Sequence, residues 1–353
     1  MPRFQIRRLP FVSFAIAFAL ALGSLSRPAV VVAATSSCSV DGVERIVAIG
    51  DVHGAYDRFV EILQTAGLID ARQHWSGGTA HLVQVGDVLD RGPDSRKALD
   101  LLHRLEQEAA SAHGAVHWLL GNHEVMRMLG DLRYVTPGEY QAFVTPDSEK
   151  VRANYLRTQP GPPDQLVKDT PLGLVEMRVA FGRQGQYGEW LRKLDPVARI
   201  NGILFMHGGL SKEVADIPCD TINATVHREL TNDLDKTRAA PLKSLVASEN
   251  GPLWYRGLTR EPDEFAPTVA EILAKQHARA MVVGHTIVPE GRIKTRFDGR
   301  LVMIDTGMQP AYVPGGRASA LDIQHGTYTA IYTDRRDELG AVPGESRATA
   351  PAR

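Results

Sequence analysis

Five short apolar segments, each followed at once by a polar motif containing glycine, constrain the fold of this chain most strongly. The apolar segments are residues 46–49, 82–85, 116–120, 203–206 and 280–283. The motifs that follow them are GDVHG (50–54), GDVLDRG (86–92), GNHE (121–124), HGG (207–209) and GHT (284–286). A run of four or five mostly apolar residues bounded by glycine is typical of a strand buried on both faces. The pattern therefore predicts an α/β fold in which each motif lies directly after a buried strand.

The polar side chains of these motifs are expected to meet in one pocket, because an open α/β sheet binds ligands beside the carboxyl ends of its strands. The candidate metal ligands are Asp51, His53, Asp87, Asn122, His207 and His285. A mixed oxygen and imidazole set without thiolate suits Mn, Fe or Zn better than Ca or Mg. Six protein ligands are too many for one catalytic ion with open positions, whereas two ions that share a bridging carboxylate use them all.

The five motifs, in this order, resemble those of the calcineurin-like metallophosphoesterases, and the DRG and GNHE forms are similar to the phosphoprotein-phosphatase branch. The bacterial Shewanella-like protein phosphatases look most similar, over residues 44 to 310. The resemblance implies a two-layered β-sandwich of mixed sheets flanked by helices, with further strands at 301–305 and 328–332. It also implies a phosphomonoesterase that uses two metal ions to dephosphorylate Tyr, Ser or Thr side chains in a phosphorylated protein, or a small phosphoester.

The resemblance assigns a role to each metal ligand. The first ion is bound by Asp51 and His53, Asp87 bridges both ions, and the second ion is completed by Asn122, His207 and His285. A hydroxide that bridges the two ions would attack phosphorus in line, because two cations lower the pKa of bound water.

Five further residues have roles near the metals in this interpretation. His123 lies beside a metal ligand and is predicted to be the general acid that protonates the leaving oxygen. Asp90 would orient His123, and Arg91 would bind the phosphoryl oxygens. Arg256 is the candidate for a second phosphate-binding arginine, although it is equally consistent with a core anchor that reaches water. Arg127 is the reserve candidate, or else a solvated position on the helix after GNHE.

Two other classes of function remain open. A dinucleoside polyphosphate or other nucleotide phosphohydrolase would use the same core, and Trp254 or Tyr255 would stack on the base. A non-catalytic binding protein is the second alternative. Each motif alone has an ordinary structural explanation: an aspartate after a strand commonly caps a helix, and Glu124 in the first turn of a helix complements the helix dipole.

The amino-terminal 34 residues are expected to be a secretory signal peptide. Arg3, Arg7 and Arg8 precede an apolar stretch at 11–25, and small residues at 32–34 suit cleavage after Ala34. The stretch is short for a membrane-spanning helix, and an uncleaved anchor is the alternative. The mature chain would be periplasmic or secreted, without stable membrane insertion. Loss of residues 1–34 removes four of 40 basic and none of 41 acidic side chains, which leaves a net charge of about −5. This charge gives no general attraction to nucleic acid.

The remainder reads as one metallophosphoesterase domain at 35–333, followed by a tail at 334–353 expected to be disordered. The spacing of the motifs widens between GNHE and HGG, which predicts a mostly helical insertion at about 130–187 and a helix near 189–194. Cys38 and Cys219 are the two cysteines of the chain. They form either one disulfide, between the amino-terminal segment and the loop after HGG, or two isolated thiols.

Overall fold

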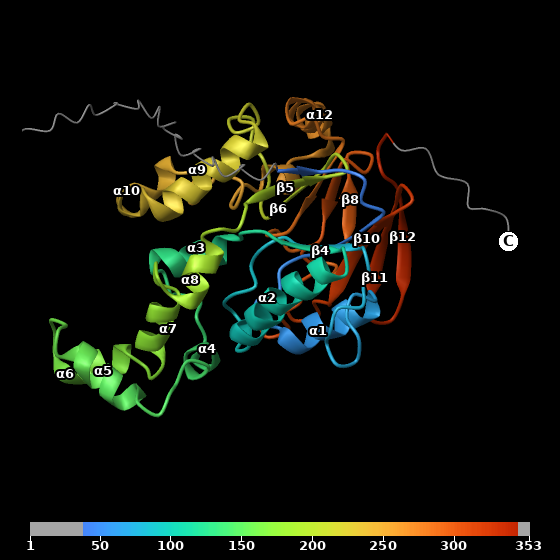
Figure 1. Ribbon diagram of the computed structural model, residues 1–353. Helices are drawn as coiled ribbons and strands as arrows, with labels where there is room; N and C mark the ends of the chain where they lie inside the picture. Colours follow the sequence, from blue (N-terminus) through green and yellow to red (C-terminus); the bar gives the residue numbers. More distant parts are fainter. Residues whose placement is uncertain (1–37, 345–353) are drawn as a thin grey trace, which may run out of the picture. The chain divides into compact units, whose positions relative to one another are not determined.

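The computed structural model describes residues 38–344, which form two mixed sheets covered by helices (Figure 1). The first sheet has the spatial order β1 (Ser39–Val40), β5 (Val197–Ile200), β6 (Ile203–Met206), β7 (Ala280–Val283), β9 (Leu301–Met303) and β8 (Lys294–Arg296). The second sheet has the order β12 (Arg336–Ala341), β11 (Thr327–Tyr332), β10 (Ser319–Gln324), β2 (Arg45–Ile49), β3 (His81–Gln84) and β4 (Ala115–Trp118). The predicted two-layered α/β architecture is confirmed.

All five apolar segments form strands, and they divide between the two sheets. Strands β2, β3 and β4 pair in parallel in the second sheet, and β6 and β7 pair in parallel in the first. The strands expected at 301–305 and 328–332 are β9 and β11. The motifs therefore follow neighbouring parallel strands, whose carboxyl ends lie at the same edge of each sheet.

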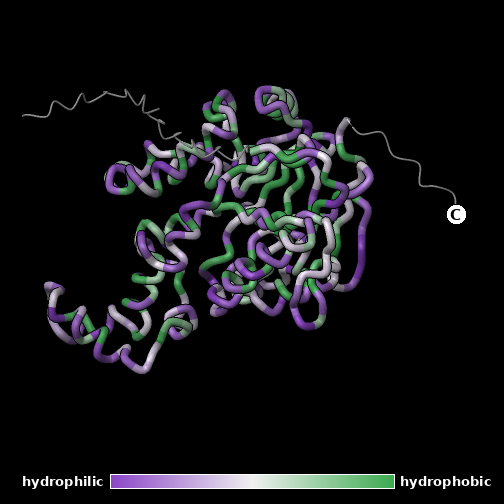
Figure 2. Tube along the Cα trace, in the orientation of Figure 1, coloured by the Kyte–Doolittle hydropathy of each residue, from purple (hydrophilic) through white to green (hydrophobic). Residues whose placement is uncertain are grey.

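Alternate residues of each central strand face different cores, as the pleat of a strand requires. In β2, Ile46 and Ala48 face the core between the two sheets, whereas Val47 and Ile49 face the outer helices. The core between the sheets also takes residues from β6, β7 and β9. Figure 2 shows the hydrophobic residues gathered along these strands. Burial of both faces explains why the five segments are almost continuously apolar.

Helices cover the outer face of each sheet. Helices α1 (Tyr56–Thr65) and α2 (Ser95–Ser111) pack against the second sheet, and α9 (Cys219–Thr231) and α12 (Ala266–Lys275) pack against the first. In α1, the buried residues Phe59, Ile62 and Leu63 recur at the spacing of one helical face. Shorter elements connect these layers: α10 (Leu234–Ala239), α11 (Gly257–Arg260) and the 3₁₀ turns Pro241–Lys243 and Asp263–Phe265.

The predicted insertion at 130–187 is helical. It follows α3 (Asn122–Leu129), which begins in the GNHE motif, and it contains α4 (Pro137–Gln141), α5 (Ser148–Leu156), α6 (Pro163–Asp169), α7 (Leu174–Ala180) and the start of α8 (Gln186–Leu191). Helix α8 begins three residues before the helix predicted at 189–194. Local capping explains the start of α4, because the Glu139 carboxylate accepts the backbone N–H of Thr136 at 3.0 Å and Pro137 occupies the first turn.

The prediction of a disordered tail from residue 334 is wrong for residues 336–341, which form β12 at the edge of the second sheet. This strand pairs antiparallel with β11, and Leu339 and Val342 pack against the core between the sheets. An edge strand tolerates the exposed charges that made the segment resemble a disordered one. Residues 345–353 and the expected signal peptide at 1–34 lie outside the described residues.

The two cysteines form a disulfide. Cys38 directly precedes β1 and Cys219 is the first residue of α9, and their Cα atoms are 6.1 Å apart. The backbone N–H of Cys38 donates to Asp220 at 2.6 Å, which adds a second link at the same place. Among the described residues, no helix is long and apolar enough to cross a membrane.

Candidate metal centre

The structure brings all six predicted metal ligands together at the carboxyl ends of the central strands. Each of these side chains is buried, with at most 6 % of its residue surface exposed. All but His207, which is fully buried, line one small cavity of about 100 Å³, and His207 contacts the same carboxylate as its neighbours. Residues far apart in the chain meet here. The backbone N–H of His285, for example, donates to Asp51 at 3.0 Å across a separation of 234 residues.

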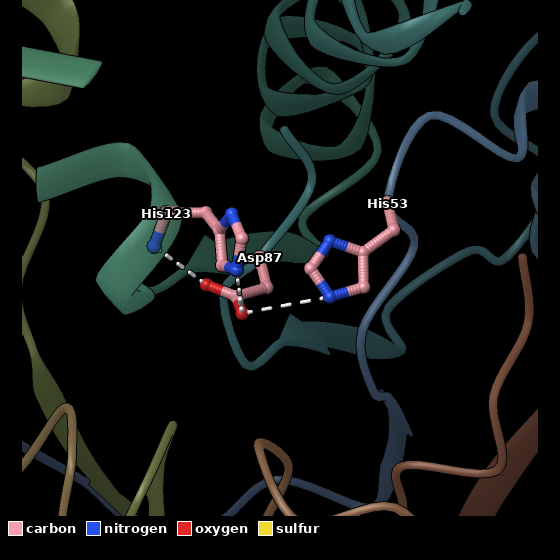
Figure 3. A group of neighbouring side chains, drawn as sticks. All are labelled: His53, Asp87 and His123. Carbon is pink, nitrogen blue, oxygen red and sulfur yellow. Dashed lines mark hydrogen bonds and ion pairs between the residues drawn. The ribbon is translucent and has the colours of Figure 1, made fainter. Parts of the chain in front are cut away.

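Asp87 lies between His53 and His123 (Figure 3), and it also belongs to a second group of donors with His207 and His285. Its Oδ2 atom lies 3.1 Å from Nε2 of His207, 3.7 Å from Nε2 of His53 and 3.8 Å from Nε2 of His123. Two groups of donor atoms, each within 4.8 Å of one another, share this carboxylate: His53, Asp87 and His123 in one, and Asp87, His207 and His285 in the other. A carboxylate common to two groups is the arrangement that a bridged pair of ions requires.

Two histidines are oriented by hydrogen bonds to backbone carbonyls. Nδ1 of His53 lies 2.9 Å from the carbonyl oxygen of Leu89, and Nδ1 of His207 lies 3.0 Å from that of Val85. These carbonyl oxygens favour the tautomer in which Nδ1 carries the proton and donates the hydrogen bond. In that tautomer Nε2 of each ring has a free lone pair, and it faces Asp87. Burial lowers the pKa of His53 to about 4, so its ring is neutral at pH 7, as a metal ligand must be.

Two further donors, Asn122 and Asp51, follow strands β4 and β2 of the second sheet. Oδ1 of Asn122, at the start of α3, lies 2.9 Å from Nε2 of His207. Oδ2 of Asp51 lies 3.8 Å from Nε2 of His53. A side chain at Gly284 would come within 2.4 Å of the Asp51 carboxylate, so this close approach of the GHT loop requires glycine.

The electrostatics of the cavity favour bound cations. Burial raises the pKa of Asp51 well above its ordinary value, and the neighbouring carboxylates of Asp305 and Asp87 raise it further. Burial also lowers the pKa of His285 to about 2, so this imidazole is neutral. Crowded buried carboxylates beside neutral imidazoles are costly without a counter-ion. The donor set therefore fits divalent metal ions.

His123 takes part in a buried chain of charged groups. Nδ1 of His123 lies 2.6 Å from Oδ2 of Asp90, and Arg127 donates to Oδ1 of Asp90 at 2.5 Å and to Glu139 at 2.9 Å. Burial lowers the pKa of His123, but the carboxylates of Asp87 and Asp90 outweigh burial and hold this pKa above its ordinary value. Asp90 contacts His123 as predicted.

Arg127 is only 4 % exposed, and its Nη2 atom donates to both Asp90 and Glu139. The interpretation of Arg127 as a solvated surface position is therefore wrong. Arg127 does not line the cavity of the metal centre, and its role as a reserve phosphate ligand stays a prediction. The helical pattern after GNHE gave no sign that this arginine points inwards, because its partner Glu139 lies in the insertion.

Both predicted phosphate-binding arginines line the cavity. The Arg91 guanidinium lies 3.7 Å from the centre of the Tyr134 ring and 4.2 Å from that of Tyr312. Its Nε atom is buried and has no hydrogen-bond partner within residues 38–344, as expected of a donor reserved for a ligand. Arg256 donates to the backbone oxygen of His285 at 2.5 Å and is half-buried. This contact holds Arg256 beside the metal ligands rather than in the apolar core.

Sequence reasoning missed one acidic residue of the cavity. Asp305 is 2 % exposed, and burial raises its pKa to about 6. The sequence does contain the pattern that marks the other motifs: an apolar run at 301–304 precedes Asp305, and a glycine follows at 307. The predicted strand extended to 305 and therefore concealed this residue, whereas β9 ends at Met303.

Glu124 has a second role beside the one expected from the sequence. Its carboxylate accepts the backbone N–H of Asp87 at 2.8 Å, of Val88 at 2.9 Å and of Gly121 at 2.9 Å. Glu124 thus fixes the loop that carries Asp87, in addition to its place in the first turn of α3. A carboxylate that accepts several backbone N–H groups holds a loop rigidly.

A shared buried carboxylate, neutral imidazoles and two arginines together define a metal-dependent site that accepts a phosphate group. Residues 44–289 match the family model described as calcineurin-like phosphoesterase. The chain belongs to this family, and it is a metal-dependent phosphatase.

Relatives and solved structures agree with this assignment. The chain is 32 % identical to Shewanella-like protein phosphatase 2 of Arabidopsis thaliana, over 77 % of this chain and 73 % of the relative. It is 30 % identical to Shewanella-like protein phosphatase 1 of Plasmodium berghei, over 75 % of this chain and 67 % of the relative. The crystal structure of a cold-active protein-tyrosine phosphatase from a psychrophilic Shewanella species is similar, with a TM-score of 0.68, 29 % identity, and coverage of 85 % of this chain and 82 % of that one.

Proposed function

We propose that this phosphatase hydrolyses phosphate monoesters on protein side chains, phosphotyrosine first and phosphoserine or phosphothreonine second. The observation that carries the proposal is the donor set around Asp87 with Arg91 and Arg256 at the same cavity. The ions would be held by Asp51 and His53 on one side, by Asn122, His207 and His285 on the other, and by Asp87 between them. When bound, two divalent ions supply Lewis acidity and acidify water near neutral pH.

His123 is proposed to hold the proton that the leaving oxygen needs. Its Nε2 atom faces the cavity beside Asp87, while Nδ1 is engaged by Asp90. The hydrogen bond to Asp90 fixes the ring, and the neighbouring carboxylates raise the pKa of His123, which stabilises its protonated form. Arg127 supports this arrangement from behind, because it holds Asp90 in place.

Arg91 and Arg256 are proposed to bind the phosphoryl oxygens. Arg91 presents an unpaired buried Nε, and the rings of Tyr134 and Tyr312 flank its guanidinium. Stacking on two rings restricts the guanidinium, so less freedom is lost when a phosphate binds. Tyr312 is 38 % exposed and lines the cavity, so an aromatic leaving group would meet an aromatic wall there. This wall supports phosphotyrosine as the preferred substrate.

The substrate proposal is tested by comparing hydrolysis of a phosphotyrosyl peptide, a phosphoseryl peptide and a dinucleoside tetraphosphate by the metal-loaded enzyme. We expect the highest kcat/KM for the phosphotyrosyl peptide. Tyr312→Leu should lower kcat/KM for this peptide more than for the phosphoseryl peptide, because it removes the aromatic wall and leaves the metals. Strong preference for the dinucleoside tetraphosphate would contradict the proposal and favour a nucleotide phosphohydrolase.

The ions are proposed to be Mn, Fe or Zn, with manganese as the first candidate, and the mature enzyme is proposed to be periplasmic or secreted. The donor types support the metals. The disulfide between Cys38 and Cys219 supports an oxidising compartment. Amino-terminal sequencing of protein from an export-competent host should find a start just after Ala34. Retention of residue 1 on soluble cytoplasmic protein would contradict export.

A further inference from the structure

A second cavity, of about 540 Å³, shares no lining residue with the metal centre. It is formed by the end of α3, the segment from α7 to α8, and the junction of α9 and α10. These elements gather on the left of the view in Figure 1. A cavity of this volume accommodates a small ligand or a phosphorylated side chain.

The side chains around this cavity are strongly basic. Within the described part of the chain, its lining includes a single acidic residue, Asp235, and five arginines: Arg127, Arg178, Arg183, Arg192 and Arg238. The carboxylate of Asp235 is 3.8 Å from Arg238, and its side chain is fully exposed, so it neutralises little of this charge. The cavity therefore has an excess of positive charge.

Arg192 is a buried cation without an anionic partner. It is 5 % exposed, and it donates to the backbone oxygens of Gly188 at 2.7 Å and Leu230 at 3.0 Å. No carboxylate in residues 38–344 pairs with it. Burial lowers the pKa of Arg192, and the nearby charges of Arg238 and Arg183 lower it further. A buried guanidinium that faces other guanidinium groups is costly unless an anion joins them.

Arg127 connects this cavity to the catalytic side chains. It lines the cavity, and its Nη2 donates to Asp90, which in turn contacts His123. Its Nε is buried and lacks a hydrogen-bond partner among the described residues. The wall of the cavity nearest the metal centre thus contains a cationic donor that is not fully satisfied.

We propose that this basic cavity is a second phosphate-binding site. Planar guanidinium groups present paired N–H donors that match phosphate oxygens, and several converging cations suit a dianion better than a single carboxylate. The phosphate comes either from free inorganic phosphate, the product of the reaction, or from a second phosphorylated residue of the substrate. The site does not depend on which side chain is dephosphorylated at the metal centre.

The test is titration of the metal-loaded enzyme with inorganic phosphate in a calorimeter. We expect two phosphate ions per chain for the wild type. The cavity variant replaces the exposed residues Arg183 and Arg238 together by alanine. Its affinity for inorganic phosphate should fall at least about tenfold at one of the two sites and stay unchanged at the other. Its turnover of a small aryl phosphate and its thermal midpoint should match those of the wild type.

The control replaces Arg152 of α5 and Arg157, the residue directly after α5, by alanine, which removes the same charge from outside the cavity. We expect the control to retain both phosphate sites. One phosphate per chain in the wild type, or equal loss of affinity in the cavity and control variants, would overturn the proposal.

Peptides separate the two sources of phosphate once the second site is established. Both peptides are compared between the wild type and the cavity variant. If the variant raises KM about tenfold for a doubly phosphorylated peptide and leaves KM for a singly phosphorylated peptide unchanged, the site binds a second phosphate of the substrate. An unchanged KM for both peptides, with loss of inorganic phosphate binding, would assign it to the product.

Discussion

At the scale of single residues, His123 combines the position of a metal ligand with the hydrogen bonding of a general acid. Its Nε2 lies 3.8 Å from Asp87, close enough to join one of the two groups of donor atoms. Its Nδ1 is held by Asp90, which suits a group that must present a proton in a fixed direction. A metal ligand and a general acid differ in what their removal does to the bound ions.

His123→Asn should lower kcat by roughly 10²–10⁴-fold and leave the metal content unchanged, because it removes proton transfer and no metal ligand. Turnover of a phosphotyrosyl peptide and elemental analysis of the same preparation measure the two quantities. A substrate with an acidic leaving group should be affected less, since it needs less protonation. Loss of metal from His123→Asn would show that His123 is a ligand.

At the scale of elements, the charged groups around Arg127 join the loop after β3 to α3 and α4. Arg127→Met should destabilise the fold by about 3–5 kcal/mol, because it removes the guanidinium that pairs with the buried carboxylates of both Asp90 and Glu139. Urea unfolding of the metal-free protein measures this change. Arg133→Met is the matched control, because the pair of Arg133 with Asp131 is exposed and should contribute little. Equal effects of the two substitutions would contradict the structural role of Arg127.

The disulfide ties the segment before β1 to α9 across 181 residues of sequence. Replacement of Cys38 and Cys219 together by serine should lower the free energy of unfolding by about 2–4 kcal/mol, because the unfolded chain loses a long closed loop. Urea unfolding of the wild type should show the same loss of unfolding free energy when reductant is added. Reductant should not change the unfolding free energy of the double variant. If reductant does not change that of the wild type either, the prediction of a stabilising disulfide is contradicted.

Helix α2 contains a carboxyl group whose titration should make stability depend on pH. Burial raises the pKa of Glu106 to about 7, although a hydrogen bond from Trp190 partly opposes this. The folded state therefore favours protonated Glu106, and its contribution to stability is lost as pH rises from about 4.5 to 7. Glu106→Gln should be more stable than the wild type by about 1 kcal/mol at pH 8, allowing for partial exposure, and similar at pH 4.5. A difference independent of pH would contradict this account.

At the scale of the whole molecule, the central strands and the convergence of the six candidate ligands were predictable. Strands buried on both faces leave a local apolar signature, and the motifs follow them directly. The exposed edge strand β12 was not predictable, since its charges resemble those of a disordered tail and its pairing depends on β11. The inward position of Arg127 and the basic cavity were not predicted, for a related reason. Their partners come from the insertion and from α9–α10, and sequence spacing carries no information about how these elements pack.

The central claim is that two divalent ions share Asp87, and the metal-to-chain ratio measured by elemental analysis tests it most directly. Protein loaded with manganese and freed of excess ion should contain about two ions per chain. Asp87→Asn should retain far less metal and almost no phosphatase activity, while its circular dichroism spectrum matches that of the wild type. A wild type that is fully active with one ion, or an Asp87→Asn variant with normal metal content, would contradict the account.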